Sequence, residues 1–300
     1  MTALLFASVA LKAQSSADWA ISEAGAMVRK GRANEARASL EATIRELETR
    51  KDTLRLLRAL ALLGRAEYDL GELPAALRHL QRTIDLGVDA GSHSEVGRAY
   101  TIKAIIAQET SHPDSAKHLY ERAIQYHLRA GDTSACAIVY DNLGQFNLNA
   151  GDIPGAIVWS EKALTCLKDT SWPDHYRTAA LIESSLSNYH TWLGDRVKGI
   201  EHGERSMRLA RRSGEVYAIV HTGTQLAGAY LANGEARKAL PLLLRSDSLA
   251  SRHAIPLNKH RDIPELLSTA YEMLGDPVKA LGYYKQRAAL NDSLRNNATR

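Results

Sequence analysis

The sequence has 300 residues, of which 45% are hydrophobic and 24% are charged, a balance that excludes a largely disordered chain. Aromatic residues make up only 6% and prolines number eight, which favours long helices that pack closely. The formal net charge is +4 and the basic residues are scattered beside acidic ones, so we predict no nucleic-acid partner.

The N-terminal residues contain a short apolar stretch from Ala3 to Leu11, followed by Ala13 and Gln14. A small residue that closes such a stretch resembles the cleavage site of a bacterial export signal, although no basic residue precedes it. We therefore interpret residues 1–13 as a candidate signal peptide; the alternative is a frayed or capping first helix. No other stretch reaches 18 apolar residues, so the sequence predicts no membrane-spanning helix.

A turn signal recurs along the rest of the chain at nearly constant spacing. A glycine, replaced once by serine, stands at positions 31, 71, 111, 151, 194, 234 and 275, at intervals of 40, 40, 40, 43, 40 and 41 residues. The fifth residue after each turn is small in every copy: Ala36, Ala76, Ala116, Ala156, Gly199, Ala239 and Ala280. A second small position recurs before each turn: Ala24, Gly64, Ala104, Gly144, Ser187, Ala227 and Ser268.

This pattern predicts a hairpin of two helices in every repeat. Glycine ends the first helix because it adopts the left-handed conformation without a Cβ penalty. An acidic residue often follows and favours the start of the second helix, where a proline in the first turn also fits. The two small positions allow a close approach of the helices. We expect seven hairpins, near residues 17–50, 57–90, 97–130, 137–170, 180–213, 220–253 and 261–294.

The blocks Leu63–Leu77 and Leu143–Ile157 each hold a Leu-Gly pair, a glycine followed by an acidic residue, and an alanine beyond the turn. They resemble the tetratricopeptide repeat (TPR) family. The resemblance implies an all-α fold, a right-handed α-solenoid of about seven TPR-like helix hairpins, in a single superhelical domain over residues 14–296. The period of about 40 residues is similar to long-helix variants in bacterial peptide-pheromone receptors and in sensor regions of bacterial signalling proteins.

In the TPR family the first helix of each hairpin lines a concave face, and members bind extended peptides or helices there. The resemblance therefore implies a row of polar partner-binding residues at the inward positions of the first helices. The row consists of Arg58, Arg65, Tyr68, Arg98, Asp141, Asn142, Gln145, Asn149, Asn188, Trp192, His221 and Gln225. Such a row suits hydrogen bonding to a peptide backbone; the alternative is a groove that is only hydrated.

Catalytic and metal-binding motifs do not occur in the sequence. It has no glycine-rich phosphate loop, no G-x-S-x-G or H-E-x-x-H motif, and no two histidines three or four residues apart. We therefore expect no enzyme activity, no metal and no cofactor.

The two cysteines, Cys136 and Cys166, lie on opposite sides of the turn at residue 151, each 15 residues away. Two antiparallel helices would place them level with each other, so an exported chain forms a disulfide there if both side chains face inward. The alternative is that both are small buried residues.

These observations predict a non-catalytic protein- or peptide-binding scaffold with its ligand in the concave groove. We expect an extracytoplasmic sensor or interaction module of a bacterial signalling system, located in the periplasm or cell envelope. The alternative is a cytoplasmic peptide-binding receptor or adaptor.

Overall fold

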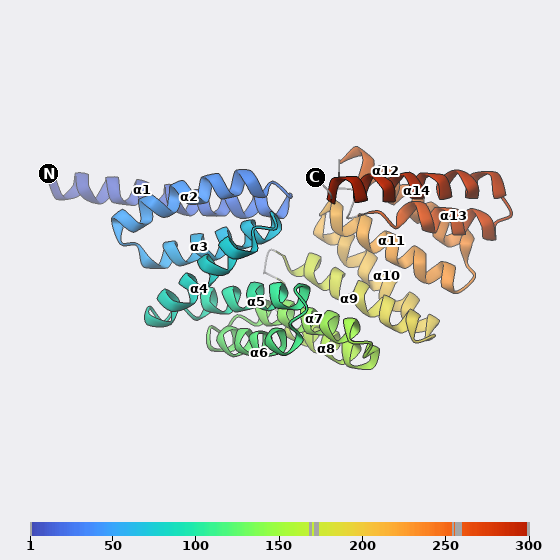
Figure 1. Cartoon of the computed structure of the whole chain (residues 1–300), viewed down its shortest axis with the longest axis horizontal. Coiled ribbons are helices and arrows are strands. Elements are labelled where there is room, and N and C mark those ends of the chain that lie inside the picture. Colours follow the sequence, from blue (N-terminus) through green and yellow to red (C-terminus); the bar gives the residue numbers. More distant parts are fainter. Residues whose placement is uncertain (1, 168–169, 171–173, 254, 256–259, 299–300) are drawn as a thin grey trace. The chain divides into compact units, whose positions relative to one another are not determined.

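The computed structural model describes residues 2–167, 170, 174–253, 255 and 260–298. These residues form fourteen α-helices and no strand, as Figure 1 shows. They divide into two compact units, Met1–Val139 and Tyr140–Arg300, and each unit is described by itself below. Within the described part of the chain, no helix has the length and apolar character needed to cross a membrane.

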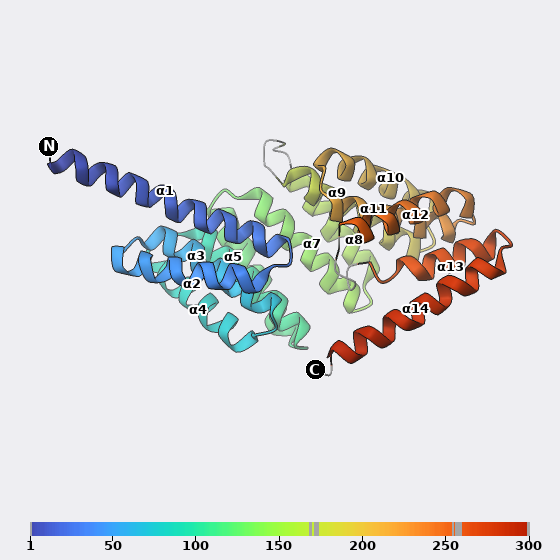
Figure 2. The same cartoon turned by 90° about the horizontal axis from the view of Figure 1, so that it is seen from above.

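The first unit contains six complete helices and the start of a seventh. They are α1 (Thr2–Arg29), α2 (Ala33–Arg50), α3 (Thr53–Asp69), α4 (Leu73–Asp89), α5 (His93–Glu109), α6 (Pro113–Arg129) and the first part of α7 (Thr133–Asn149). Figure 2 shows that α1 extends well beyond the end of α2. The candidate signal peptide falls in that helix, and its cleavage stays a prediction.

The second unit contains the rest of α7 and seven further helices. They are α8 (Ile153–Cys166), α9 (His175–Trp192), α10 (Arg196–Ser213), α11 (Val216–Ala232), α12 (Ala236–Arg252), α13 (Ile263–Met273) and α14 (Pro277–Ala298).

Neighbouring helices pair into hairpins, each odd-numbered helix with the even-numbered helix that follows it. Within each unit the first helices of successive hairpins also touch, α1 with α3 and α3 with α5, then α9 with α11 and α11 with α13. Each hairpin thus packs on its neighbours along the chain, which is the architecture of a solenoid. The predicted all-α solenoid of about seven TPR-like hairpins is confirmed.

The helix lengths explain the long repeat. The helices α3, α4, α5 and α6 each have 17 residues, and three residues connect each to the next. Two such helices with two such connections make the period of 40. The extra length relative to a 34-residue repeat therefore lies in the helices.

The turns inside the hairpins have the predicted left-handed backbone. The six turn glycines have φ between 74° and 84°. Ser111, which stands in the place of the glycine in the third hairpin, adopts the same conformation with φ 62°. A residue with a side chain pays about 1–2 kcal/mol in this region, so the turn shape is imposed by the hairpin around it.

A second group of left-handed residues closes the turns between hairpins, and the sequence-based prediction did not include it. It consists of Lys51, Gly91, Gly131 and Gly214. In two of these turns the glycine is followed by an acid that caps the next helix: Asp132 accepts a hydrogen bond from the Ala135 amide, and Glu215 accepts one from the Ala218 amide. The same glycine-plus-acid signal therefore marks both kinds of turn.

The acids that follow the hairpin glycines cap the second helices only when they are aspartates. Asp152, Asp195 and Asp276 each accept a hydrogen bond from the amide three residues later. Glu72 and Glu235 stand at the same position and make no such bond. The shorter aspartate side chain places its oxygen within reach of the first free amides of the helix.

The small residue of each first helix lies against the second helix of its own hairpin. A Cβ atom on Gly144 would lie 3.1 Å from the carbonyl oxygen of Ala156 and 2.8 Å from Oγ of Ser160. A Cβ atom on Gly64 would lie 3.4 Å from the carbonyl oxygen of Ala76. The predicted close approach of the two helices is confirmed at these positions.

Where serine takes the small position, its hydroxyl donates to the corresponding carbonyl. The distance is 2.7 Å from Ser187 Oγ to the Gly199 oxygen and 2.8 Å from Ser268 Oγ to the Ala280 oxygen. The serine thus gains a hydrogen bond where glycine or alanine only avoids a clash.

Two glycines in the first helices of the second unit give a matched test of this contact. We expect Gly144→Ala to lower the free energy of unfolding by about 1–3 kcal/mol, because the new methyl group meets Ala156 and Ser160. Gly228→Ala should raise it by about 0.5–1 kcal/mol, because nothing lies within 4 Å of the added Cβ and alanine is the better helix former. Urea unfolding followed by circular dichroism measures both. A similar change in the two variants would contradict the close-contact interpretation.

Candidate functional site

The predicted site residues lie on the first helices of the hairpins, and we call the surface that these helices form the first-helix face. In the first unit this face belongs to α1, α3 and α5. In the second it belongs to α7 from Tyr140 onward and to α9, α11 and α13. Each unit has its own part of the face.

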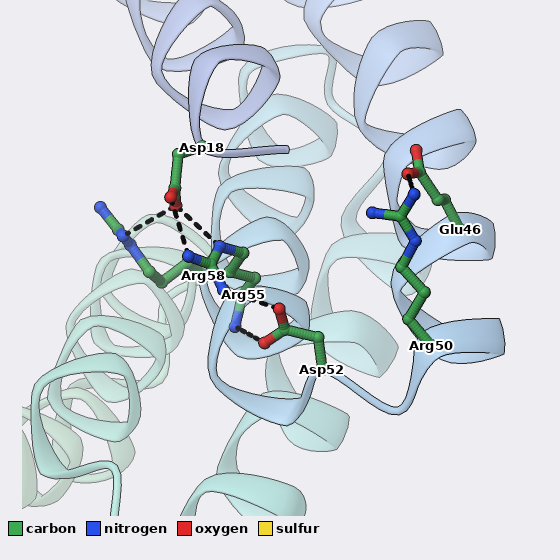
Figure 3. Close-up of polar contacts among 6 residues, drawn as sticks. All are labelled: Asp18, Glu46, Arg50, Asp52, Arg55 and Arg58. Carbon is green, nitrogen blue, oxygen red and sulfur yellow. Dashed lines mark hydrogen bonds and ion pairs between the residues drawn. The ribbon is translucent and has the colours of Figure 1, made fainter. Parts of the chain in front are cut away.

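In the first unit, Arg58 lies beside an ion-pair cluster between α1 and α3 (Figure 3). The guanidinium of Arg55 donates to both carboxylate oxygens of Asp18, at 3.0 and 2.9 Å, and to Asp52 at 2.7 Å. Nη1 of Arg58 lies 3.7 Å from Oδ1 of Asp18. The hydrogen bonds from Arg55 lower the pKa of Asp18. Arg58 therefore helps to join two first helices, and its side chain is still 53% exposed.

Tyr68 and Arg65 form a second contact on this face. The Tyr68 hydroxyl donates to Oε1 of Glu109 at 2.6 Å, which joins α3 to α5. The Arg65 guanidinium lies 5.4 Å from the centre of the Tyr68 ring, and its Nε donates to Asp69 at 3.0 Å. Burial and the bond to Glu109 raise the pKa of Tyr68.

Arg98 of α5 is the more open of the predicted residues in the first unit. Its guanidinium is 4.0 Å from the carboxylate of Glu95, and its side chain is 54% exposed. In this unit the predicted row is therefore a series of side chains that connect neighbouring first helices, with two arginines still accessible to solvent.

In the second unit, Asp141 does not point into an open surface. Oγ of Ser160 donates to its carboxylate at 3.3 Å, so the carboxyl is held between α7 and α8. Burial raises the pKa of Asp141 to about 6, while hydrogen bonds from Ser160 and Ser185 act in the opposite direction. The neighbouring Asn142 has its Nδ2 buried without a hydrogen-bond partner. Both residues are more enclosed than a groove surface requires.

Other predicted residues of this unit are accessible. Nε2 of Gln145 donates to Oδ1 of Asn149 at 3.3 Å, and both side chains are exposed. Asn188 is half-buried. Trp192 is 58% exposed at the end of α9, with its ring centre 6.1 Å from that of Tyr189.

His221 and Gln225 lie together in a polar pocket of about 190 Å³, which we call the α11 pocket. His221 stacks on Tyr217 with ring centres 5.8 Å apart. The pocket is bordered by four residues of α11 and three residues just before α13: Tyr217, His221, Thr224, Gln225, His260, Arg261 and Asp262. It presents amide, hydroxyl, imidazole and both signs of charge within one small volume.

The sequence-based prediction missed the half of this pocket that precedes α13. It expected a hairpin from about residue 261, whereas α13 has only 11 residues and begins at Ile263. A signal was present: Asp262-Ile263-Pro264 repeats Asp152-Ile153-Pro154, where α8 begins. The turn spacing hid the difference, because a longer connection and a shorter helix cancel in the 41-residue interval.

Metal-binding groups were not expected, and across the described residues no three or more His, Cys, Asp or Glu side chains lie close enough to hold an ion. Cys136 is buried and Cys166 is half-buried, and both are thiols in this structure. They belong to different units, so the disulfide between them stays a prediction.

No protein-family model and no curated protein sequence matches this chain. Among solved structures, it is similar to a Rap protein complexed with Competence and Sporulation Factor: 15% identity, TM-score 0.65, covering 94% of this chain and 78% of that one. It is also similar to Pseudomonas aeruginosa PilF: 17% identity, TM-score 0.57, covering 84% of this chain and all 100% of that one.

A third similar structure is a signal transduction ATPase with numerous domains and a tetratricopeptide repeat sensor, from Pyrococcus horikoshii. The identity is 16% and the TM-score 0.60, covering 88% of this chain and 41% of that one. At these identities the similarity establishes the fold alone. The fold and its turn chemistry define the chain as a TPR-like solenoid protein of the long-helix type.

The buried carboxyl of Asp141 predicts a pH-dependent stability. Its pKa rises from 3.8 to about 6 on folding, so the folded state holds this proton more tightly than the unfolded state. The resulting stabilisation is complete below about pH 4 and is lost as the pH rises through about 6. Asp141→Asn should therefore be more stable than the wild type near pH 8, by on the order of 2–3 kcal/mol, and similar near pH 4.

Urea unfolding at the two pH values measures this difference. Asp89→Asn, which changes an exposed carboxyl on α4, is the control and should alter stability by less than about 0.5 kcal/mol at either pH. A wild-type protein whose stability does not fall relative to Asp141→Asn between these pH values would refute the assignment.

Proposed function

We propose that this protein is a non-catalytic scaffold that binds a protein or peptide on the first-helix face, with the α11 pocket as its anchoring point. We further propose that it is a sensor or interaction module of a bacterial signalling system outside the cytoplasm.

The α11 pocket is the observation that carries the binding proposal. It combines side chains that donate and accept hydrogen bonds, such as Gln225 and Thr224, with the His221–Tyr217 stack. A peptide backbone offers both donors and acceptors, and its side chains enter pockets of this size, so the chemistry matches an extended or helical peptide segment.

The similar structures support the same class of function. The Rap protein is complexed with Competence and Sporulation Factor, and the Pyrococcus horikoshii protein is described as carrying a tetratricopeptide repeat sensor. A shared fold does not transfer a ligand, so the proposal for this chain rests on its own pocket.

A photo-crosslinking amino acid placed at position 225 tests the binding surface in the host. We expect p-benzoylphenylalanine at Gln225 to give a discrete crosslinked species, because this side chain borders the α11 pocket. The control is the same substitution at Glu161, an exposed position on the second helix α8 of the same unit. Equal labelling at both positions, or none at Gln225, would contradict the proposed surface.

The proposed location outside the cytoplasm is supported by the apolar stretch before Ala13. Fractionation of cells that produce the chain with a C-terminal tag should recover it from the periplasm or envelope, and mass spectrometry should find an N-terminus at Gln14. Recovery only from the cytosol with Met1 retained would favour the alternative, a cytoplasmic peptide-binding receptor or adaptor.

A further inference from the structure

A second concave site lies on the opposite side of the hairpins from the first-helix face, between two second helices. We call it the second-helix groove. It has a volume of about 520 Å³ and runs between α10 and α12, over α11. Arg208 and Arg211 of α10 and Arg237 of α12 border it, and Met207, Leu226 and Leu242 supply apolar surface.

The positive charge of the protein gathers at this groove. The helix α10 carries six Lys or Arg and two Glu, and α12 carries four Lys or Arg and one Asp. The second helices of other hairpins are nearly balanced: α4 has two of each sign, and α8 has one of each. Basic residues that look scattered along the sequence are therefore concentrated in space, beyond what the net charge of +4 indicates.

The three groove arginines have no side-chain partner among the described residues, and all three are exposed. The other charged groups of the groove are engaged. Glu204 accepts the hydroxyl hydrogen of Tyr230 at 2.8 Å, and Lys238 pairs with Glu235. Because the acids at hand do not neutralise the arginines, the groove presents unpaired guanidinium groups beside apolar surface.

Pro241 adds a hydrogen-bond acceptor to the same site. It stands inside α12, is exposed, and borders the groove. Proline has no N–H, so the carbonyl oxygen of Arg237, four residues earlier, lacks its intrahelical donor. A proline inside a helix costs about 3 kcal/mol relative to alanine, yet here it leaves a backbone acceptor one turn away from the groove proline.

We infer that the second-helix groove binds an acidic peptide segment that carries apolar side chains. Carboxylates match the unpaired arginines, which form bidentate pairs with them. Apolar side chains match Met207, Leu226 and Leu242. A backbone amide of the peptide matches the carbonyl of Arg237. A nucleic-acid backbone or a lipid headgroup satisfies the arginines but leaves the apolar surface without a partner, so the peptide fits the groove better.

Fluorescence anisotropy tests the inference with the full chain and a fluorescein-labelled peptide of Asp-Leu-Glu-Leu repeats, in about 50 mM NaCl. Arg208→Ala with Arg237→Ala should weaken binding about tenfold or more, because two charge-assisted contacts are lost. The matched control is Arg196→Ala with Arg252→Ala, which removes the same charge from the same two helices outside the groove. It should weaken binding less than about twofold.

Probes of other chemistry separate the alternatives. A peptide of Asp-Ser-Glu-Ser repeats should bind about tenfold more weakly, because it lacks apolar side chains. Equal weakening by the two double variants, or absence of binding, would overturn the inference. So would tighter binding of oligo-deoxythymidine or of phosphatidylserine vesicles. Crosslinking at Gln225 reports on the first-helix face, so the failure of one proposal is distinguishable from the failure of the other.

Discussion

The close contact between two small residues is the constraint on which each hairpin depends. At Gly144 and Gly64 a single added carbon would meet the carbonyl oxygen of the small residue on the second helix. Helices that approach so closely leave no room for large side chains between them at that level. The larger side chains therefore pack above and below, and fully buried leucines such as Leu40 and Leu60 in the first unit and Leu243 in the second fill this space.

Because the hairpins pack on each other through both helices, each hairpin keeps two surfaces that the core does not use. On the first-helix face, polar side chains meet across neighbouring first helices, as Asp18 does with Arg55. Between second helices the spacing is wider and α11 forms the base, which leaves room for the second-helix groove. One repeated contact thus produces two binding surfaces of different chemistry, a mixed polar pocket and a basic groove with apolar parts.

Much of the candidate site could be read from the turn spacing, and part of it could not. The spacing placed His221 and Gln225 on one surface, and the structure brings them into the α11 pocket. It also placed Asp141 on that surface, yet the carboxyl is held by Ser160 of the neighbouring helix. A helical period predicts which face a residue occupies within about a quarter turn, and that margin separates an open position from a packed one.

The sequence by itself determined the number of hairpins, their turns and their closest contacts, because these depend on local requirements. A left-handed turn favours glycine, and a close helix approach demands a small side chain, wherever they occur. Only the tertiary structure decided what lies between hairpins. The short helix α13 opened room for His260 beside α11, and the stacking of α10 and α12 gathered Arg208 and Arg237. These groups lie far apart in the sequence, and no local rule relates them until successive hairpins have packed.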